Sequence, residues 1–502
     1  MRFDFFKNEK KQEWLVVVAL LALLVSLLIP TFYIGRYSFR QADDFAYADT
    51  VWKETHSFLK SFSYEFRQSI RLYHDWQGLY LSNFLFLLVQ TFLADDFYFL
   101  TPIIAIISLI ISEIFASKMI FSDLLNSSFR RSLLISLPII IFQISVPVSA
   151  SEAYYWLCSV ISYTLMFSLY AFFSAYILKS FFLSKLRGKS FFFTMLGCFF
   201  IAGINYMFSL PFACFLFLLV LYSFLKKKKD LCYRIISLFV IYIFFFCLNV
   251  FSPGARARQV DAANLSINPL KAIMLSFSSA VEFISDYWHL PLTLLALALI
   301  PLFIKISSEN KFTFRKPWIF SIVSFSLFSS QFTPCLYALG IIGAYRVQNI
   351  YLFTMLIFVL GNIFFWVGFI CQKVTEKHLQ KKEAIRKPSK FTFSTLITSS
   401  LAFLIIFYVS FYKVYGYSMT PFSAYRSIKQ GEAEAYYQQW QERLELLNDD
   451  SIKECEFEPY VNAPYTLFFQ DLTDNKIAWQ SPAEGMALYY GKTSIKLKEK
   501  ED

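Results

Sequence analysis

The chain has 502 residues, of which 57% are apolar, 20% aromatic and only 17% charged. Soluble domains carry roughly 25% charged residues, so this composition excludes a soluble globular enzyme, a disordered chain and a fibrous protein. The net charge of +11 does not indicate nucleic-acid binding, because the basic residues gather in short clusters between apolar stretches and form no continuous basic face.

Apolar stretches of roughly 17–25 residues recur along the chain, long enough to cross about 30 Å of hydrocarbon. They fall at 14–34, 79–94, 97–121, 132–148, 157–178, 190–206, 209–225, 232–250, 289–306, 317–333, 347–371 and 391–413. The sequence therefore predicts an all-α polytopic membrane protein with about 11–13 transmembrane helices. The first stretch is too long for a cleaved signal peptide, so we expect an uncleaved helix.

The basic clusters predict the orientation of the helices. They lie at 2–11, 118–131, 179–189, 226–234, 305–316 and 373–390. Cytoplasmic loops carry an excess of Lys and Arg, so we place these clusters, and the N-terminus, in the cytoplasm. The segments that then face outside are 35–78, around 149–157, 207–208, 251–288, 334–346 and everything after 413. One of the stretches 79–94 and 97–121 must fail to cross, because an odd number of crossings is required there.

The first outer loop, 35–78, contains two adjacent carboxylates directly after the first membrane helix, Asp43 and Asp44. Repulsion between them and partial burial would raise one pKa, which suits a general base. The alternative is that they cap the next helix in solvent. The aromatic and charged residues of the loop predict helices lying on the outer surface.

Two further groups of polar and aromatic residues lie at the outer ends of membrane stretches. They could form a rim that binds a sugar or a headgroup, because aromatic rings stack on the C–H faces of pyranoses. The alternative is the ordinary aromatic belt of a membrane protein. The groups are Trp76, Tyr80 and Asn83 in the first loop, and Glu152, Tyr155 and Trp156 in a short outer turn.

Arginines also occur on the outer side, against the topological bias. Arg256 and Arg258 follow Pro253-Gly254, a pair that predicts a tight turn. Two arginines spaced two apart in such a turn can present their guanidinium groups to one phosphate. Arg346, in a later outer segment, is a second candidate for binding an anionic headgroup. Together, acids and arginines on separate outer loops predict a site that holds an anionic leaving group and removes a proton.

The tail, 417–502, predicts a small α+β extracytoplasmic domain separate from a transmembrane domain at 1–416. It has 15 acidic and 9 basic residues. Apolar periodicity predicts a helix at 432–447 and short strands at 456–461, 465–469 and 486–497. The eight cysteines include no CxxC pair, so neither a zinc site nor a disulfide framework is indicated.

Several short motifs in this order carry a resemblance to a known family. They are Asp43-Asp44-Phe45-Ala46-Tyr47-Ala48, Trp76-Gln77-Gly78 with Tyr80 and Asn83, Glu152 with Tyr155-Trp156 and Ser162-Tyr163, Ser252-Pro253-Gly254 with Arg256 and Arg258, Arg346, Trp440-Gln441-Glu442-Arg443, and Ala487-Leu488-Tyr489-Tyr490-Gly491 with Ser494-Ile495. The sequence resembles GT-C-type membrane glycosyltransferases, and more closely a bacterial glucosyltransferase-like membrane family of unknown function. It departs from that family at Gly78-Leu79-Tyr80, where Gly-Arg-Tyr is frequent, and at Asn205, near which the family often has a carboxylate.

The resemblance implies a GT-C fold and a hexosyltransferase in a bacterial plasma membrane. Its donor would be a polyprenyl-phosphate-linked sugar, its acceptor a cell-envelope polysaccharide or glycolipid, and Asp43 or Asp44 would be its catalytic aspartate. No cofactor is expected, and a divalent metal is left open. The alternatives are a lipid-linked sugar flippase or transporter, which would place polar residues near the bilayer midplane, and a receptor or assembly factor that uses the acidic tail.

Overall fold

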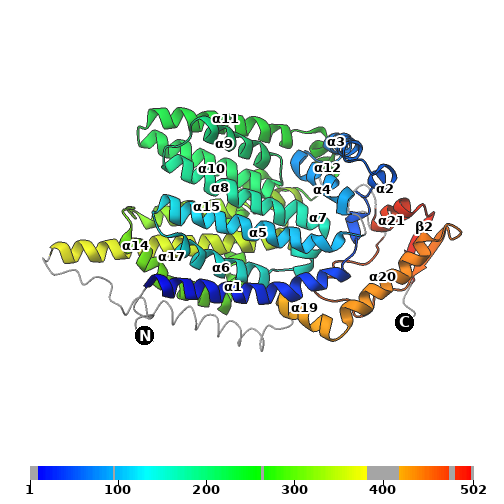
Figure 1. Cartoon of the computed structure of the whole chain (residues 1–502). Helices are drawn as coiled ribbons and strands as arrows, with labels where there is room; N and C mark the ends of the chain where they lie inside the picture. The colour runs from blue at the N-terminus through cyan, green and yellow to red at the C-terminus, as the bar shows by residue number, and fades with distance from the viewer. Residues whose placement is uncertain (1–8, 94–95, 262–264, 381–417, 474–480, 499–502) are drawn as a thin grey trace.

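The computed structural model describes residues 9–93, 96–261, 265–380, 418–473 and 481–498, and these are mostly helical (Figure 1). Eight helical stretches in these ranges are long and apolar enough to cross a membrane, which makes the chain a multi-pass membrane protein. The helices of the bundle are α1 (Glu9–Ile34), α5 (Thr101–Ser117), α6 (Phe129–Ser145), α8 (Leu165–Phe182), α9 (Gly188–Ala202), α10 (Tyr206–Leu225), α11 (Lys229–Val250), α14 (Leu290–Glu309), α15 (Pro317–Ser330) and α17 (Tyr345–Gln380).

The predicted apolar stretches between 14 and 371 all form helices, and several of these are short. The helix α4 (Tyr80–Leu93) has 14 residues, α9 has 15 and α6 has 17. The helices α5 and α15 are also short, but they continue into adjoining helical turns as apolar stretches of 27 and 23 residues. At 1.5 Å per residue, α4 spans about 21 Å, less than the hydrocarbon thickness. It is therefore the best candidate for the stretch that does not cross. The predicted span 391–413 lies outside the described residues, so the total of 11–13 stays a prediction.

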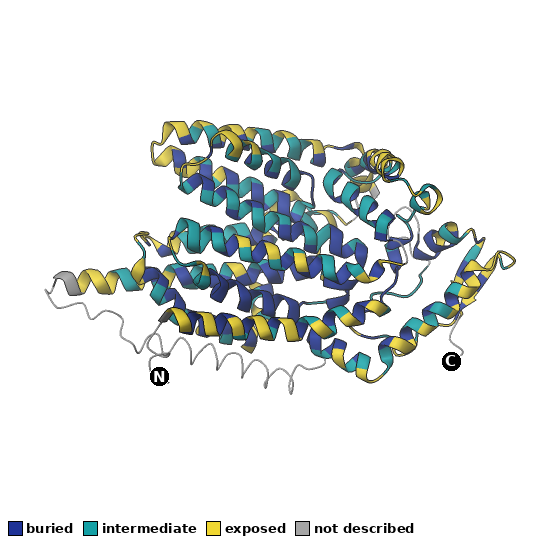
Figure 2. Cartoon of the chain, viewed as in Figure 1, coloured by how far each residue is buried: buried dark blue, intermediate teal, exposed yellow. Residues whose placement is uncertain are grey.

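The bundle is held by packing between neighbouring helices, above all α5 with α8, α14 with α17, and α10 with α11. Their buried side chains form one apolar cluster, in which large aromatics such as Phe208, Phe212 and Tyr242 are fully enclosed. Figure 2 shows buried residues through the middle of the bundle and exposed ones on its outer helices. Exposed apolar side chains such as Phe244 on α11 lie where lipid would surround the protein.

One end of the bundle carries the short elements that build the candidate site, and the C-terminal elements lie at this same end (Figure 1). Short π-helical turns at 151–155 and 160–164 interrupt the chain there. The helices outside the bundle, up to residue 380, are α2 (Val51–Thr55), α3 (Phe58–Asp75), α4, α7 (Leu157–Ser159), α12 (Pro253–Asp261), α13 (Pro269–Tyr287) and α16 (Thr333–Leu339).

The C-terminal region contains α19 (Thr420–Lys429), α20 (Glu432–Asn448), β1 (Glu454–Phe457), α21 (Pro482–Tyr490) and β2 (Ser494–Leu497). The two strands pair in parallel, from Glu454 opposite Ser494 to Phe457 opposite Leu497. The predicted helix at 432–447 is confirmed. The strand predicted at 465–469 is wrong, and only the last residues of 486–497 are extended. A capping box explains the helix in the second of these segments. The side chains of Ser481 and Glu484 accept hydrogen bonds from each other's backbone N–H, so α21 begins at Pro482.

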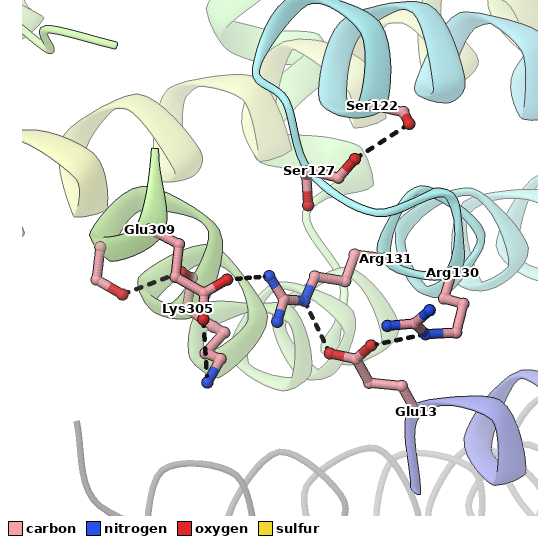
Figure 3. A network of polar contacts seen from close by, with 8 residues as sticks. Glu13, Ser122, Ser127, Arg130, Arg131, Lys305 and Glu309 are labelled. Atoms are coloured by element: carbon pink, nitrogen blue, oxygen red, sulfur yellow. Dashed lines mark hydrogen bonds and ion pairs between the residues drawn. The ribbon is translucent and has the colours of Figure 1, made fainter. Parts of the chain in front are cut away.

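An ion-pair network closes the opposite end of the same helices (Figure 3). Glu13 of α1 accepts hydrogen bonds from Arg130 Nε at 3.0 Å and Arg131 Nε at 2.7 Å, both on α6. Arg131 also pairs with Glu309 of α14, whose carboxylate lies 3.1 Å from Lys305 Nζ. The network thereby joins three helices far apart in the sequence, α1 to α6 through the almost fully buried Glu13 and α6 to α14 through Arg131.

Replacing Glu13 with Ala should destabilise the protein, because two arginines would lose their shared buried partner. Removing one member of a buried pair costs about 3–5 kcal/mol, which thermal unfolding of the purified protein in detergent would register as a lower Tm. Asp230→Ala is the control, since its pairs with Arg187 and Arg234 are exposed and the Tm should move much less. Equal shifts in the two variants would contradict the role given to Glu13.

Candidate functional site

Asp44 is a fully buried carboxylate that ties the loop after α1 to two other parts of the bundle. It accepts hydrogen bonds from Tyr98 Oη at 2.6 Å, Cys158 N at 3.0 Å and Gln41 N at 3.2 Å. Gln90 of α4 donates to its backbone carbonyl. Burial raises the pKa of Asp44 to about 6, and the hydrogen bonds limit that rise. With its carboxylate oxygens engaged by these donors, Asp44 positions the loop.

Asp43, the preceding residue, is half-buried, and the charges of two arginines from distant segments act on its carboxyl group. Burial raises the pKa of its carboxyl group above the usual range of an aspartate, and the positive charges of Arg346 and Arg258 oppose that rise. The acid and both arginines are therefore close enough to interact electrostatically. This is the juxtaposition that the sequence predicted for the outer loops.

Arg258 reaches the site through the segment Trp76-Gln77-Gly78. Its Nη1 donates to Gln77 Oε1 at 2.7 Å, and its guanidinium carbon lies 4.7 Å from the Trp76 ring centroid. Two glycines allow the backbone of 76–78 to lie directly against that of 249–254. A Cβ on Gly78 would lie 2.0 Å from the Asn249 carbonyl oxygen, and one on Gly254 would lie 2.6 Å from the backbone nitrogens of Trp76 and Gln77. The two segments therefore interlock.

Arg256 does not join Arg258. The sequence predicted a turn that presents both guanidinium groups to one phosphate, but residues 253–261 form the helix α12. Residues two apart on a helix point to opposite sides, so only one of the pair can face the site. Arg256 is exposed, and among the described residues no hydrogen bond or ion pair is recorded for its side chain. The prediction of a paired arginine clamp is wrong for this reason.

Arg346 is held by Glu152 and by aromatic rings. Glu152 Oε2 accepts from the Arg346 backbone N–H at 3.1 Å and from its Nη1 at 3.4 Å. The guanidinium carbon lies 5.2 Å from the Trp156 ring centroid and 6.0 Å from that of Tyr163. Burial raises the pKa of Glu152, and the charge of Arg346 opposes this. Glu152 therefore positions Arg346 near Asp43.

Trp156 stacks on Phe469 of the C-terminal region, with the ring centroids 3.9 Å apart and an interplanar angle of 12°. Its indole Nε1 is buried and has no hydrogen-bond partner among the described residues. Tyr155 is fully buried, and its hydroxyl donates to the Thr31 carbonyl of α1 at 2.8 Å. Tyr155 thus lies in the core of the bundle, away from any surface on which a sugar could stack.

Tyr80 and Asn83 have packing partners of their own. The Tyr80 hydroxyl donates to the Phe199 carbonyl at 2.7 Å, and a Cβ on Gly203 would lie 2.1 Å from the Tyr80 ring. Asn83 Oδ1 accepts from Gln77 Nε2 at 2.8 Å. Asn83 thereby orients the amide that meets Arg258, whereas Tyr80 braces the start of α4 against α9.

The C-terminal region closes over the first loop. Gln41 Nε2 donates to the Leu467 carbonyl at 2.9 Å, and its Oε1 accepts from the Phe469 N–H at 2.9 Å. Phe39 stacks on Trp440 with centroids 4.7 Å apart. The contacts of Gln41, two residues before Asp43, make residues 467–469 part of the wall of the site.

Sequence reasoning did not single out Tyr47, Gln77 and Phe469 as site residues. The Trp76 indole N–H donates to the Tyr47 oxygen, and burial together with neighbouring groups that include Asp43 raises the Tyr47 pKa. Tyr47 and Gln77 lie within the motifs at 43–48 and 76–78 that carry the family resemblance. Phe469 is more than 300 residues from Trp156, so no local pattern could have paired them.

Among the described residues, no group of three or more His, Cys, Asp or Glu side chains lies together as metal ligands would. Comparison of the chain with protein-family models, with curated proteins and with solved structures finds no match.

Asp44→Asn should lower thermal stability, because the new amide NH₂ group would face at least one of the three N–H or O–H groups that donate hydrogen bonds to Asp44. Each buried donor left without an acceptor costs about 1–3 kcal/mol. Asp43→Asn should leave the Tm nearly unchanged, since no buried donor depends on it in the described structure. Thermal unfolding monitored by size-exclusion chromatography would compare the two variants, and equal Tm values would contradict the positioning role of Asp44.

Proposed function

We propose that the protein is a membrane glycosyltransferase of the GT-C type. It moves a sugar from a polyprenyl-phosphate donor to a cell-envelope glycan or lipid-linked acceptor at the outer face of the membrane. The observation that carries the proposal is the placement of Asp43, a half-buried carboxylate within electrostatic reach of Arg258 and Arg346. These arginines come from separate segments at one end of a membrane-embedded bundle.

Each of these groups has a role in the proposed reaction. Asp43 takes the proton from an acceptor hydroxyl, whose oxygen attacks the anomeric carbon from the face opposite the phosphate. The bond from that carbon to the phosphate oxygen breaks, and the electron pair stays on the lipid phosphate. Arg258 stabilises the negative charge that develops there. Arg346, held by Glu152, favours the ionised form of Asp43, because its positive charge opposes the effect of burial on the Asp43 pKa.

The geometry divides the work of the adjacent acids. Asp43 is the better candidate for the base, because Asp44 is fully buried and accepts three hydrogen bonds from protein donors. Trp76 lies under Arg258 and is the aromatic residue best placed to line the sugar site. Phe469 covers one face of the Trp156 ring. Trp156 therefore contacts the sugar with its ring edge or donates to it through the indole N–H, which has no partner among the described residues.

A lipid-linked sugar flippase is the alternative. The observation that favours it is a polar pair inside the bundle, in which Gln143 Nε2 donates to the buried Glu113 at 2.9 Å, since ionisable residues within membrane helices often mark transport paths. The two functions predict different products. A transferase incubated with a labelled polyprenyl-phosphate sugar and an acceptor releases the free lipid phosphate, whereas a flippase leaves the donor intact.

Asp43→Asn should abolish this release while the protein stays folded. Loss of a general base slows a reaction by about 10²–10⁴-fold. Asp75→Asn is the matched control, because Asp75 is an exposed acid on the same loop and, within the described part of the chain, its side chain pairs only with Arg71. The proposal does not survive if the Asp43 variant releases lipid phosphate at the rate of the control.

The pH dependence tests the electrostatic interaction between Asp43 and Arg258. The ionised form of Asp43 is the active one, so activity falls as the pH drops through its raised pKa. Arg258→Gln removes a positive charge that favours ionisation, so the acidic limb of the kcat/KM profile should move to higher pH. Arg256→Gln removes the same charge from the other side of α12 and should leave that limb in place. A shift toward lower pH with Arg258→Gln would contradict the assignment.

A further inference from the structure

The helix α3 has its polar side buried and its apolar side exposed. The residues it turns toward the protein are Ser61, Glu65, Ser69 and Leu72. The residues it turns outward are Phe58, Leu59, Phe62, Phe66 and Ile70. A helix on the surface of a soluble protein shows the opposite arrangement, so the apolar stripe of α3 needs an apolar environment outside the protein.

The position of α3 supplies that environment. In Figures 1 and 2 the helix is seen nearly along its axis, whereas the bundle helices run across the view. It therefore lies across the end of the bundle. Tyr73 Oη donates to the Leu248 carbonyl at the end of α11 at 2.7 Å, and Leu248 and Phe251 there are 42% and 63% exposed. The stripe on α3 thus continues the apolar outer surface of a membrane-spanning helix.

The exposed charges of α3 are predominantly basic. Lys60, Arg67 and Arg71 are all exposed. Of the two acids on the helix, Glu65 is buried, and Asp75 lies 3.5 Å from Arg71. An apolar stripe flanked by basic residues is typical of helices that lie in the headgroup region of a bilayer, where each basic residue gains from anionic lipid.

We propose that α3 is an interfacial anchor that binds anionic phospholipid headgroups through Lys60, Arg67 and Arg71 while its apolar stripe enters the acyl boundary. The proposal depends on the membrane location of the protein and not on the transferase chemistry. It adds a lipid-binding surface to a helix whose last residues lead directly into the candidate site.

The polar side of α3 links this anchor to the first loop. Thr91 Oγ1 of α4 lies 2.6 Å from Glu65 Oε1 and 2.8 Å from Asp49 Oδ2. The hydroxyl can donate to only one carboxylate, so the other contact needs a protonated acid, and burial raises the pKa of Glu65 to about 8. Trp76, which contacts Arg258, follows the last residue of α3. The depth of α3 in the headgroup layer therefore sets the depth of Trp76 and Arg258.

Hydrogen exchange in nanodiscs tests the anchor. The full chain would be placed in phosphatidylcholine discs and in discs that also contain phosphatidylglycerol, and amide exchange over 58–75 compared by mass spectrometry. We expect slower exchange in the anionic discs. Because each basic residue near an anionic surface changes binding about fivefold, K60Q/R67Q/R71Q should remove the difference between the two lipids.

The control is K429Q/K453Q/K496Q, which removes the same charge from exposed positions in the C-terminal region and should keep the lipid-dependent difference. The anchor is refuted if the wild-type chain exchanges equally in both discs, or if both triple variants lose the difference alike. Slower exchange over 58–75 that requires two copies of the chain in a disc, and does not depend on lipid charge, would also refute the anchor. That result would show that α3 joins two chains. None of these readouts uses a sugar donor, so they stand apart from the test of Asp43.

Discussion

The buried carboxylate of Asp44 is the interaction on which the rest of the site depends. A carboxylate removed from water must find donors, and Asp44 finds them on Tyr98 at the start of the α5 span, on Gln41 in its own loop and on Cys158 beside the π-turn that carries Glu152. One residue therefore fixes three segments relative to one another. Asp43 is held at their junction simply because it is the neighbouring residue.

The two ends of the bundle use charge in different ways. At the end that holds Glu13, carboxylates and basic groups pair with one another, and the network joins α1, α6 and α14. At the other end, Arg346 is paired with Glu152, but Arg258 contacts an amide and an indole ring and forms no ion pair with any described residue. A cation held by neutral groups keeps its charge available for an anion, whereas a paired cation does not. This contrast separates a structural end from an end suited to binding.

The sequence predicted the helices well because hydrophobic length is a local property, and each stretch from 14–34 to 347–371 became a helix. It also predicted that acids and arginines of the outer loops would share one end of the bundle, and the charges of Arg258 and Arg346 do act on the carboxyl group of Asp43. It failed where local geometry decided the outcome. Arg256 was separated from Arg258 by the helical rotation of α12, and the capping box at Ser481 replaced a strand with a helix. Tyr155 was predicted to bind a sugar because it is an aromatic residue in an outer turn, but its hydroxyl donates a hydrogen bond to the Thr31 carbonyl of α1. Contacts such as Gln41 with Leu467, 426 residues apart, have no local signature.

The clamp formed by Gln41 has a consequence for the order in which the protein is assembled. Residues 467–469 are synthesised after all the helices of the bundle, yet they complete the wall beside Trp156 and hold the loop that contains Asp43. A nascent chain can insert its bundle before these residues exist, but its site is then unfinished. Function is thereby postponed until residues 467–469 have left the ribosome and folded back onto the first loop.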